Sequence, residues 1–269
     1  MTEKHEINPN QSVELLKALH ILTRDGKLNQ DSRRKLKQVN HLVNFIAPLF
    51  NSLEGDVTLV DHGAGKSYLG FILYDLLVKT HENARVIGIE TRADLVQKSQ
   101  ALAKLCGFER MDFQHLTVEQ SIQSEALPNR VDIVSALHAC NTATDDAIQF
   151  GLKKQAKYMV LVPCCQAEVA EVLRLHKNES FGKTPLSEMW RHPIHTREFG
   201  SQITNVLRCL QLEAHGYNVT VTELVGWEHS MKNELIIAKY AGQPRRNARE
   251  RIAAILQQFN LQDLSARFV

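Results

Sequence analysis

The feature that most constrains this chain is an apolar strand that ends in an acidic residue and runs into a glycine turn and a helix. The stretch is Thr58-Leu-Val-Asp-His-Gly-Ala-Gly-Lys-Ser-Tyr-Leu-Gly70, and Asp61 ends the apolar run. Gly63 and Gly65 lack a Cβ, so the backbone can turn tightly and a ligand can approach it closely. From Lys66 onward the apolar residues recur at helical spacing, at Leu69, Ile72, Leu73, Leu76 and Leu77. Such a unit places a ligand at the carboxyl edge of a parallel sheet, against a helix N-terminus.

The spacing of the glycines separates three kinds of site that use such a turn. A P-loop requires a glycine at position 60, where this chain has Val60. A dinucleotide site requires a small residue at position 68, and the residue here is Tyr68. The remaining pattern, Asp-x-Gly-x-Gly, resembles motif I of the class I S-adenosylmethionine-dependent methyltransferases. That resemblance implies that Asp61 lies near the methionine amino group and that the glycines admit the methionine part of the cofactor. A turn that only joins strand to helix is the structural alternative.

A second acidic residue ends the next predicted strand. The segment Arg85-Val-Ile-Gly-Ile-Glu90 is short and apolar, and the gap from Gly65 to Glu90 holds one helix and a loop, as a βαβ unit requires. A carboxylate at this place can accept hydrogen bonds from both ribose hydroxyls of an adenosine. Because methyltransferases and dehydrogenases share this acid, it indicates an adenosine site without choosing the chemistry.

Strands and helices alternate from residue 57 to residue 163, which predicts a parallel sheet with helices on both faces. Two strands without a helix between them follow at Asn218–Gly226 and Glu234–Tyr240, and we expect them to form an antiparallel hairpin. The predicted fold class is therefore α/β, a Rossmann-like, doubly wound, mostly parallel sheet ending in an antiparallel hairpin, with N-terminal helices. The predicted parts are a helical extension at 1–50, a methyltransferase domain at 51–242 with a substrate-recognition insertion at 166–216, and a C-terminal helix at 243–269.

Composition and charge limit the partners and the cellular compartment that we expect for this chain. The chain has 269 residues, 43% of them hydrophobic, and a formal net charge of +2, so its overall charge does not indicate nucleic-acid binding. Basic residues nevertheless cluster locally, around 24–37 and around 239–251, and such clusters can hold phosphates. No apolar signal core or membrane-length run is evident, and the five cysteines lack the spacing of a disulfide framework. These features lead us to expect a cytoplasmic protein.

Two further loops are expected at the carboxyl edge of the sheet, after the fourth and fifth parallel strands. They contain Ser135-Ala-Leu-His-Ala-Cys-Asn141 and Val162-Pro-Cys-Cys-Gln166. Since these strands are neighbours in this fold, their loop residues should converge; the candidate catalytic residues are His138, Cys140, Asn141, Cys164 and Cys165. Four interpretations stay open: His138 as a general base, a cysteine as a nucleophile, metal binding by His138 with the cysteines, or simple packing.

The motifs together resemble a branch of methyltransferase-like proteins that carry His-Ala-Cys and Pro-Cys-Cys, although that branch has a glycine where this chain has Asn141. The resemblance implies S-adenosyl-L-methionine as cofactor, with contacts to the adenine from the residues after the third strand, Gln114, His115 and Leu116. A family that 2′-O-methylates tRNA has a comparable double cysteine, which favours RNA as the acceptor. A small-molecule or protein acceptor, and a non-catalytic adenosine-binding module acting through partners, are the alternatives.

Overall fold

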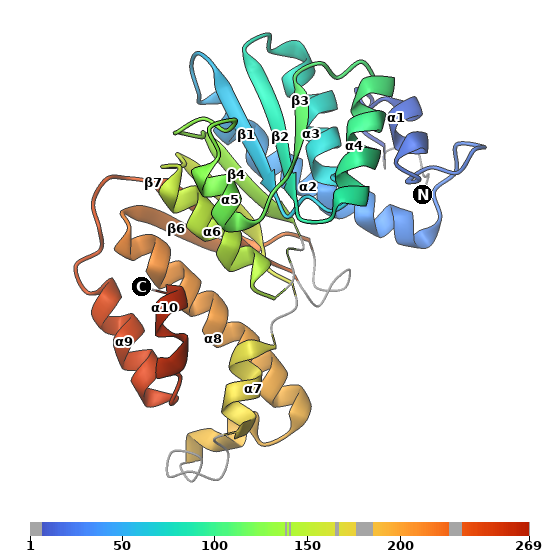
Figure 1. The fold of residues 1–269 in the computed structure, drawn as a ribbon. Coiled ribbons are helices and arrows are strands. Elements are labelled where there is room, and N and C mark those ends of the chain that lie inside the picture. The colour runs from blue at the N-terminus through green and yellow to red at the C-terminus, as the bar shows by residue number, and fades with distance from the viewer. Residues whose placement is uncertain are drawn as a thin grey trace.

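A mixed sheet of seven strands forms the centre of the molecule (Figure 1). The computed structural model describes residues 7–137, 139, 141–164, 167–175, 185–225 and 233–268. The strand order is β3-β2-β1-β4-β5-β7-β6, with β7 antiparallel to both neighbours and the first five strands parallel. The strands are β1 Val57–His62, β2 Ala84–Glu90, β3 Met111–His115, β4 Ile133–Leu137, β5 Tyr158–Val162, β6 Tyr217–Glu223 and β7 Glu234–Tyr240. This arrangement confirms the predicted fold class.

Helices cover both faces of the sheet, because successive residues of a strand point to opposite sides and both sides are apolar. In β1, Leu59 belongs to one buried cluster and Val60 to the other. The first face packs against α1 Val13–Ala18, α2 Gln30–Asn51, α3 Tyr68–Leu76 and α4 Ala93–Leu105. The second face packs against α5 Val118–Gln123, α6 Ala143–Lys153 and the last turns of α8 Pro193–Ala214.

Helix α8 also belongs, with the helices not yet named, to a helical unit that has a core of its own beside the sheet (Figure 1). They are α7 Glu168–Leu175, α8, α9 Ala248–Gln258 and α10 Ser265–Phe268, with short 3₁₀ turns η3 Pro185–Trp190 and η4 Gln262–Leu264. The ring of Trp190 stacks on Phe199 at 5.1 Å between centroids and meets Phe259 edge-on at 5.9 Å. Aromatic pairs at these separations add specific attraction to the burial of their area.

The helix α2 matters for the site because it runs against the direction of the parallel strands. Its C-terminal end lies at the amino edge of the sheet, where the Ser52 hydroxyl meets the Tyr158 hydroxyl at 3.0 Å. Its N-terminal end is capped by the Asn29 side chain, which accepts a hydrogen bond from the Ser32 amide at 2.8 Å. The N-terminal half of α2 therefore reaches the carboxyl edge, where ligands bind in sheets of this kind.

Local boundaries differ from the sequence-based prediction at several places; β6, for example, was predicted at 218–226 and spans Tyr217–Glu223. The helix after the glycine turn begins at Tyr68 instead of Lys66, because Ser67 has a left-handed backbone with φ of 51°. The third strand was expected to reach Thr117 and ends at His115, because Thr117 and Gln120 form a capping box that starts the unpredicted helix α5. The fourth strand was expected to start at Val131 and begins at Ile133. Within the described ranges, none of the helices is long and apolar enough to span a bilayer.

Candidate functional site

The glycine turn after β1 is fixed by its own backbone geometry. Gly63 and Gly65 have φ angles of 68° and 60°, in the left-handed region that glycine adopts without strain. The amide of Ala64 donates to the Ile89 carbonyl on β2 at 2.9 Å, and the amide of Ser67 donates to the Ala64 carbonyl at 2.7 Å. The turn is thus tied to the neighbouring strand and held open toward the carboxyl edge of the sheet.

Asp61 lies beneath this turn and is almost completely buried, with 2% of its surface exposed. Its carboxylate accepts hydrogen bonds from the Ser67 hydroxyl at 3.2 Å and the Ser135 hydroxyl at 3.4 Å. Burial raises the pKa of Asp61 to about 7, and the hydrogen bonds from Ser67, Ser135 and the Gly70 amide oppose that rise. A buried carboxylate with this pKa is suited to accept a cationic ligand group, because such a partner would favour its ionised form.

Glu90, at the end of β2, is joined directly to the glycine turn. Its Oε2 accepts a hydrogen bond from the Gly65 amide at 2.7 Å, and its Oε1 accepts one from the Arg92 amide at 3.0 Å. The Arg92 guanidinium adds contacts to both oxygens, at 3.1 Å from Nε and 3.4 Å from Nη2. Burial disfavours the charge, but the hydrogen bonds from Arg92 and Gly65 outweigh burial and lower the pKa of Glu90. Glu90 is therefore an ionised acceptor at neutral pH.

A cavity of about 260 Å³ opens beside these groups. It is formed by the end of β1, the glycine turn, the start of α3, α2 and the last residue of β4; the lining residues are Lys35, Gln38, Val39, Asp61, Gly63, Ala64, Gly65, Lys66, Tyr68, Leu69, Arg92 and Leu137. The structure thus brings together four of the predicted cofactor residues. Asp61, Gly63 and Gly65 line the cavity, and Glu90 is hydrogen-bonded to the lining residues Gly65 and Arg92. The sequence-based reasoning missed Arg92 and the α2 residues.

The three candidates predicted to follow the third strand lie farther from the cavity; Gln114 and His115 are within β3, and only Leu116 follows it. Gln114 pairs in register with Ile89 and donates a side-chain hydrogen bond to Asp112 on its own strand. His115 pairs with Glu90, and its Nε2 meets the Thr91 carbonyl at 2.9 Å. Leu116 packs against the cluster on the α6 side of the sheet. The end of β3 therefore lies one strand beyond Glu90, and none of these residues lines the cavity described above.

The loops after β4 and β5 carry the candidate catalytic residues. His138, Cys140 and Cys165 lie outside the described residues, so the base, nucleophile and metal interpretations stay open. Asn141 has a left-handed backbone with φ of 54°, and its side-chain oxygen accepts a long hydrogen bond of 3.5 Å from the Ala167 amide. Cys164 is half-buried. The contact from Asn141 to Ala167 joins the two loops, as expected from the pairing of β4 with β5.

A buried ion pair contacts the backbone of the loop after β4. Arg208 on α8 has no exposed surface and binds Asp145 on α6 through two contacts of 2.6 Å. Its Nη2 also donates to the Asn141 carbonyl at 3.0 Å, and its Nη1 donates to the Asn205 side chain at 3.2 Å. The planar guanidinium suits this bidentate contact. Arg208 therefore connects the C-terminal helical unit to the loop after β4, a connection that sequence spacing does not reveal.

His62 follows Asp61 but points to the other face of the sheet, where its ring lies 5.3 Å from that of Phe150. Burial lowers the pKa of His62 to about 4, although the Glu90 charge opposes that change. Neither ring nitrogen has a hydrogen-bond partner within the described part of the chain. His62 is therefore a neutral side chain that packs behind the glycine turn.

Comparison with known proteins now gives the family. Residues 34–172, just over half of the chain, match the family described as "Methyltransferase domain". A relative from Bos taurus, "Glutathione S-transferase C-terminal domain-containing protein", is 25% identical over 232 residues, which are 80% of this chain and 34% of that protein. The Drosophila melanogaster homolog is 23% identical over 231 residues, 78% of this chain and 37% of that protein. The chain therefore spans about a third of the length of these curated relatives.

Among solved structures, the CMeT domain of the citrinin polyketide synthase superposes with a TM-score of 0.50 at 13% identity. The match covers 80% of this chain and 58% of that one, and it concerns the fold alone. The sequence match is the stronger result, because it includes β1, the glycine turn, Glu90 and both candidate loops. On that match, the chain belongs to the methyltransferase-domain family.

Proposed function

We propose that this chain binds S-adenosyl-L-methionine and transfers its methyl group to an acceptor. The observation that carries the proposal is the joining of Asp61, the Gly63–Gly65 turn and Glu90 around one cavity. The donor and acceptor groups fit the cofactor. Within the described residues, Asp61 has no cationic partner, which matches the α-ammonium group of the methionine part. Glu90 is an ionised hydrogen-bond acceptor, which matches a ribose diol.

When bound, the cofactor would supply an electrophilic methyl group on a sulfonium. The chain's own task is then to orient the cofactor and the acceptor and to exclude water from the reacting atoms. Asp61 and Glu90 would hold the two ends of the cofactor, while the loops after β4 and β5 would face the acceptor. For a hydroxyl acceptor, His138 is our candidate to remove the proton.

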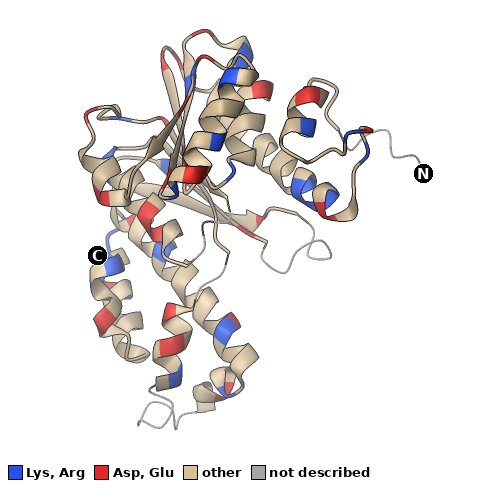
Figure 2. Cartoon of the chain, turned by 45° about the vertical axis from the view of Figure 1, so that its right-hand side comes forward, with Lys and Arg blue, Asp and Glu red and all other residues tan. Residues whose placement is uncertain are grey.

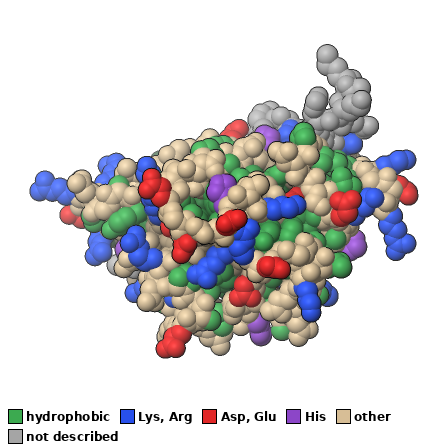
Figure 3. Space-filling view, turned by 90° about the horizontal axis from the view of Figure 1, so that it is seen from above, with side chains coloured by type: hydrophobic (Ala, Val, Ile, Leu, Met, Phe, Trp, Pro, Cys, Tyr) green, Lys and Arg blue, Asp and Glu red, His purple; other side chains and the backbone are tan. Residues whose placement is uncertain are grey.

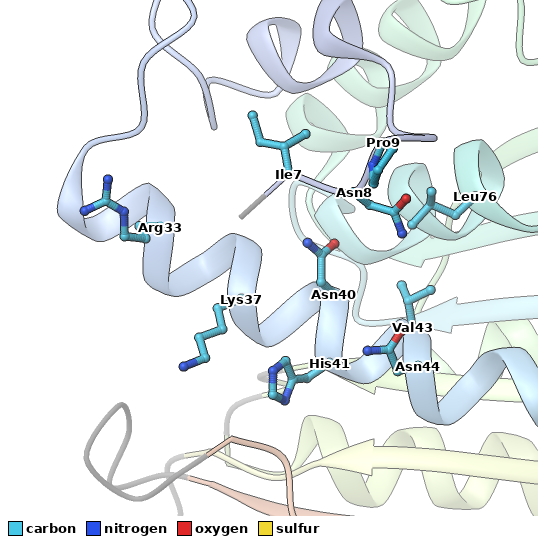
Figure 4. A pocket seen from close by; sticks show the side chains of 10 residues that line it. All are labelled: Ile7, Asn8, Pro9, Arg33, Lys37, Asn40, His41, Val43, Asn44 and Leu76. Carbon is cyan, nitrogen blue, oxygen red and sulfur yellow. The ribbon is translucent and has the colours of Figure 1, made fainter. Parts of the chain in front are cut away.

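RNA is the acceptor that we propose. The N-terminal half of α2 carries Arg33, Arg34 and Lys37, and it lies at the carboxyl edge of the sheet next to the cofactor cavity. A second cavity, of about 480 Å³, lies on the other side of this helix, and its lining includes Arg33, Lys37 and His41. Figure 4 shows Lys37 and His41 projecting from the same side of α2. The His41 ring meets the carbonyl of Leu224, just after β6, at 3.0 Å, so this surface reaches the carboxyl end of that strand.

The two basic clusters in the sequence lie at opposite edges of the sheet. Arg245 follows β7, which ends at the amino edge, where the Tyr240 amide bonds to the Lys157 carbonyl just before β5. The guanidinium of Arg245 pairs with Glu213 at 2.7 Å. Elsewhere, basic and acidic residues are mixed along the ribbon (Figure 2) and on the face seen from above (Figure 3). Of the two clusters, the one on α2 lies nearer the cofactor cavity, and this supports our proposal that it contacts the phosphate backbone of RNA.

A charge-reversal experiment tests RNA as the acceptor. We expect Arg33→Glu/Arg34→Glu/Lys37→Glu to weaken binding of a fluorescently labelled hairpin RNA by at least about tenfold at low salt, because phosphate contacts dominate such affinities. The log–log salt slope should fall by about 0.7 for each phosphate interaction that the substitutions remove. Transfer of tritium from labelled S-adenosyl-L-methionine to the RNA should fall in parallel.

The matched control reverses three arginines at the amino edge, Arg245→Glu/Arg246→Glu/Arg249→Glu, and it should leave the affinity within about twofold. Equal losses in both variants would show nonspecific attraction. If the native chain fails to bind RNA at low salt, a small-molecule or protein acceptor, or a module without catalysis, replaces this part of the proposal.

A further inference from the structure

The Glu90 carboxylate is saturated by groups of its own chain. A carboxylate offers about four good hydrogen-bond positions on its two oxygens. Two of them are taken by the backbone amides of Gly65 and Arg92, at 2.7 and 3.0 Å. Two more are taken by the Arg92 guanidinium, at 3.1 and 3.4 Å, and the Thr91 hydroxyl makes a fifth contact, at 3.3 Å. The carboxylate therefore has no position left for the two hydroxyls of a ribose.

The Arg92 guanidinium also lies over the glycine turn. A Cβ placed on Gly65 would lie 3.8 Å from Arg92 Nη2, and Arg92 lines the same cavity as Asp61 and Gly65. The space that the missing Cβ leaves free for a ligand is thus bordered by this side chain. A ligand that reached from Asp61 toward Glu90 would have to pass the guanidinium.

The two partners of this ion pair differ in exposure. The Glu90 side chain is 8% exposed, whereas the Arg92 side chain is 63% exposed. The backbone amides hold Glu90 whatever Arg92 does, because the Gly65 and Arg92 amides belong to the turn and to the start of α4. The guanidinium can move into solvent, where Asp94 in the first turn of α4 provides another negative charge.

From this geometry we infer that Arg92 is a latch on the ribose subsite, which must release Glu90 before a ribose diol can bind there. The inference rests on the proposed function, since it concerns the same cavity and an adenosine ligand. In the closed position the guanidinium satisfies the carboxylate, and in the open position the two hydroxyls replace its two contacts. Arg92 thus lowers the affinity for the ligand by the free energy of its ion pair with Glu90.

Calorimetric titration with S-adenosylhomocysteine tests the latch on the full chain. Arg92→Ala should bind about two- to fivefold more tightly than the native chain, because a half-exposed ion pair no longer has to be broken. Arg92→Lys should lie between the two. Arg197→Ala removes an exposed ion pair with Glu198 on α8, outside the lining of the cavity, and should leave the affinity unchanged.

Two further arms assign the effect to the diol and to Glu90. The gain from Arg92→Ala should be present with adenosine and absent with 2′,3′-dideoxyadenosine, which has no hydroxyls to replace the guanidinium. In a chain that already carries Glu90→Gln, adding Arg92→Ala should give no gain in affinity. Raising the salt concentration should narrow the difference between native and Arg92→Ala chains, since salt screens an exposed ion pair.

The outcomes are distinct. Tighter binding by Arg92→Ala with the diol-bearing ligands supports the latch. If the native chain binds and Arg92→Ala binds with the same or lower affinity, the latch is overturned and the proposed function still stands. If neither chain binds S-adenosylhomocysteine or adenosine, the proposed function fails, and the latch fails with it.

Discussion

Glu90→Ala is expected to reduce the affinity for S-adenosylhomocysteine by about 30- to 700-fold, equivalent to roughly 2–4 kcal/mol. The reason is that the substitution removes a buried, ionised acceptor at the end of β2, where we propose that both ribose hydroxyls bind. Isothermal titration calorimetry measures the change directly. The thermal midpoint of the variant should be recorded first, because the Gly65 amide is also deprived of its partner.

The control for this prediction is Glu109→Ala, which removes an exposed carboxylate of the same kind from the loop before β3. It should bind S-adenosylhomocysteine with native affinity. A folded Glu90→Ala protein that binds within about threefold of the native chain would contradict the ribose contact, because a single charged hydrogen bond is worth about 1.5–3 kcal/mol.

Arg208→Met is expected to lower the free energy of unfolding by about 3–5 kcal/mol, the second large effect. The side chain is completely buried, and its removal leaves the Asp145 carboxylate without its bidentate partner. The Nη1 atom of Arg267 lies 3.9 Å from that carboxylate and replaces part of the lost attraction. We therefore expect the loss of unfolding free energy to lie near the lower end of this range. Urea unfolding, followed by circular dichroism, provides the measurement.

Two variants sharpen the interpretation of Arg208→Met. Arg191→Met breaks an ion pair with Glu188 in which both side chains are more than half exposed, and it should change the unfolding free energy by less than about 1 kcal/mol. The double variant Arg208→Met/Asp145→Leu removes both buried charges and should regain most of the stability. A decrease below about 1 kcal/mol in Arg208→Met would show that the pair contributes little to the fold.

The sheet was predictable because its information is local. Each parallel strand is a short apolar run, and the absence of a helix between the two strands predicted at 218–226 and 234–240 indicated the antiparallel end. Asp61 and Glu90 could be paired for the same reason, since both end strands that the βαβ rule places side by side. The helix α5 was missed because its six residues are too few for a periodic pattern to emerge.

Other parts of the site depend on distances that sequence spacing does not encode. The turn of α2 that faces the cofactor cavity is set by packing against α3, so the apolar pattern of the helix provided no reason to single out Lys35 or Gln38. Arg208 and Asp145 are 63 residues apart and meet only because α8 crosses beside α6. Arg92 and Glu90 are close in sequence, but the role that we infer for Arg92 depends on its lining the same cavity as Asp61 and Gly65, which the sequence does not show.

Whether the cavity at the glycine turn binds an S-adenosylmethionine-type ligand can be measured directly. The purified chain should be titrated by calorimetry, in parallel, with S-adenosylhomocysteine, NAD and ATP under the same buffer conditions. We expect saturable one-to-one binding of S-adenosylhomocysteine, with NAD and ATP bound at least about tenfold more weakly, because Asp61 can pair with an α-ammonium group that neither of them carries. Tighter binding of NAD or ATP than of S-adenosylhomocysteine would contradict it.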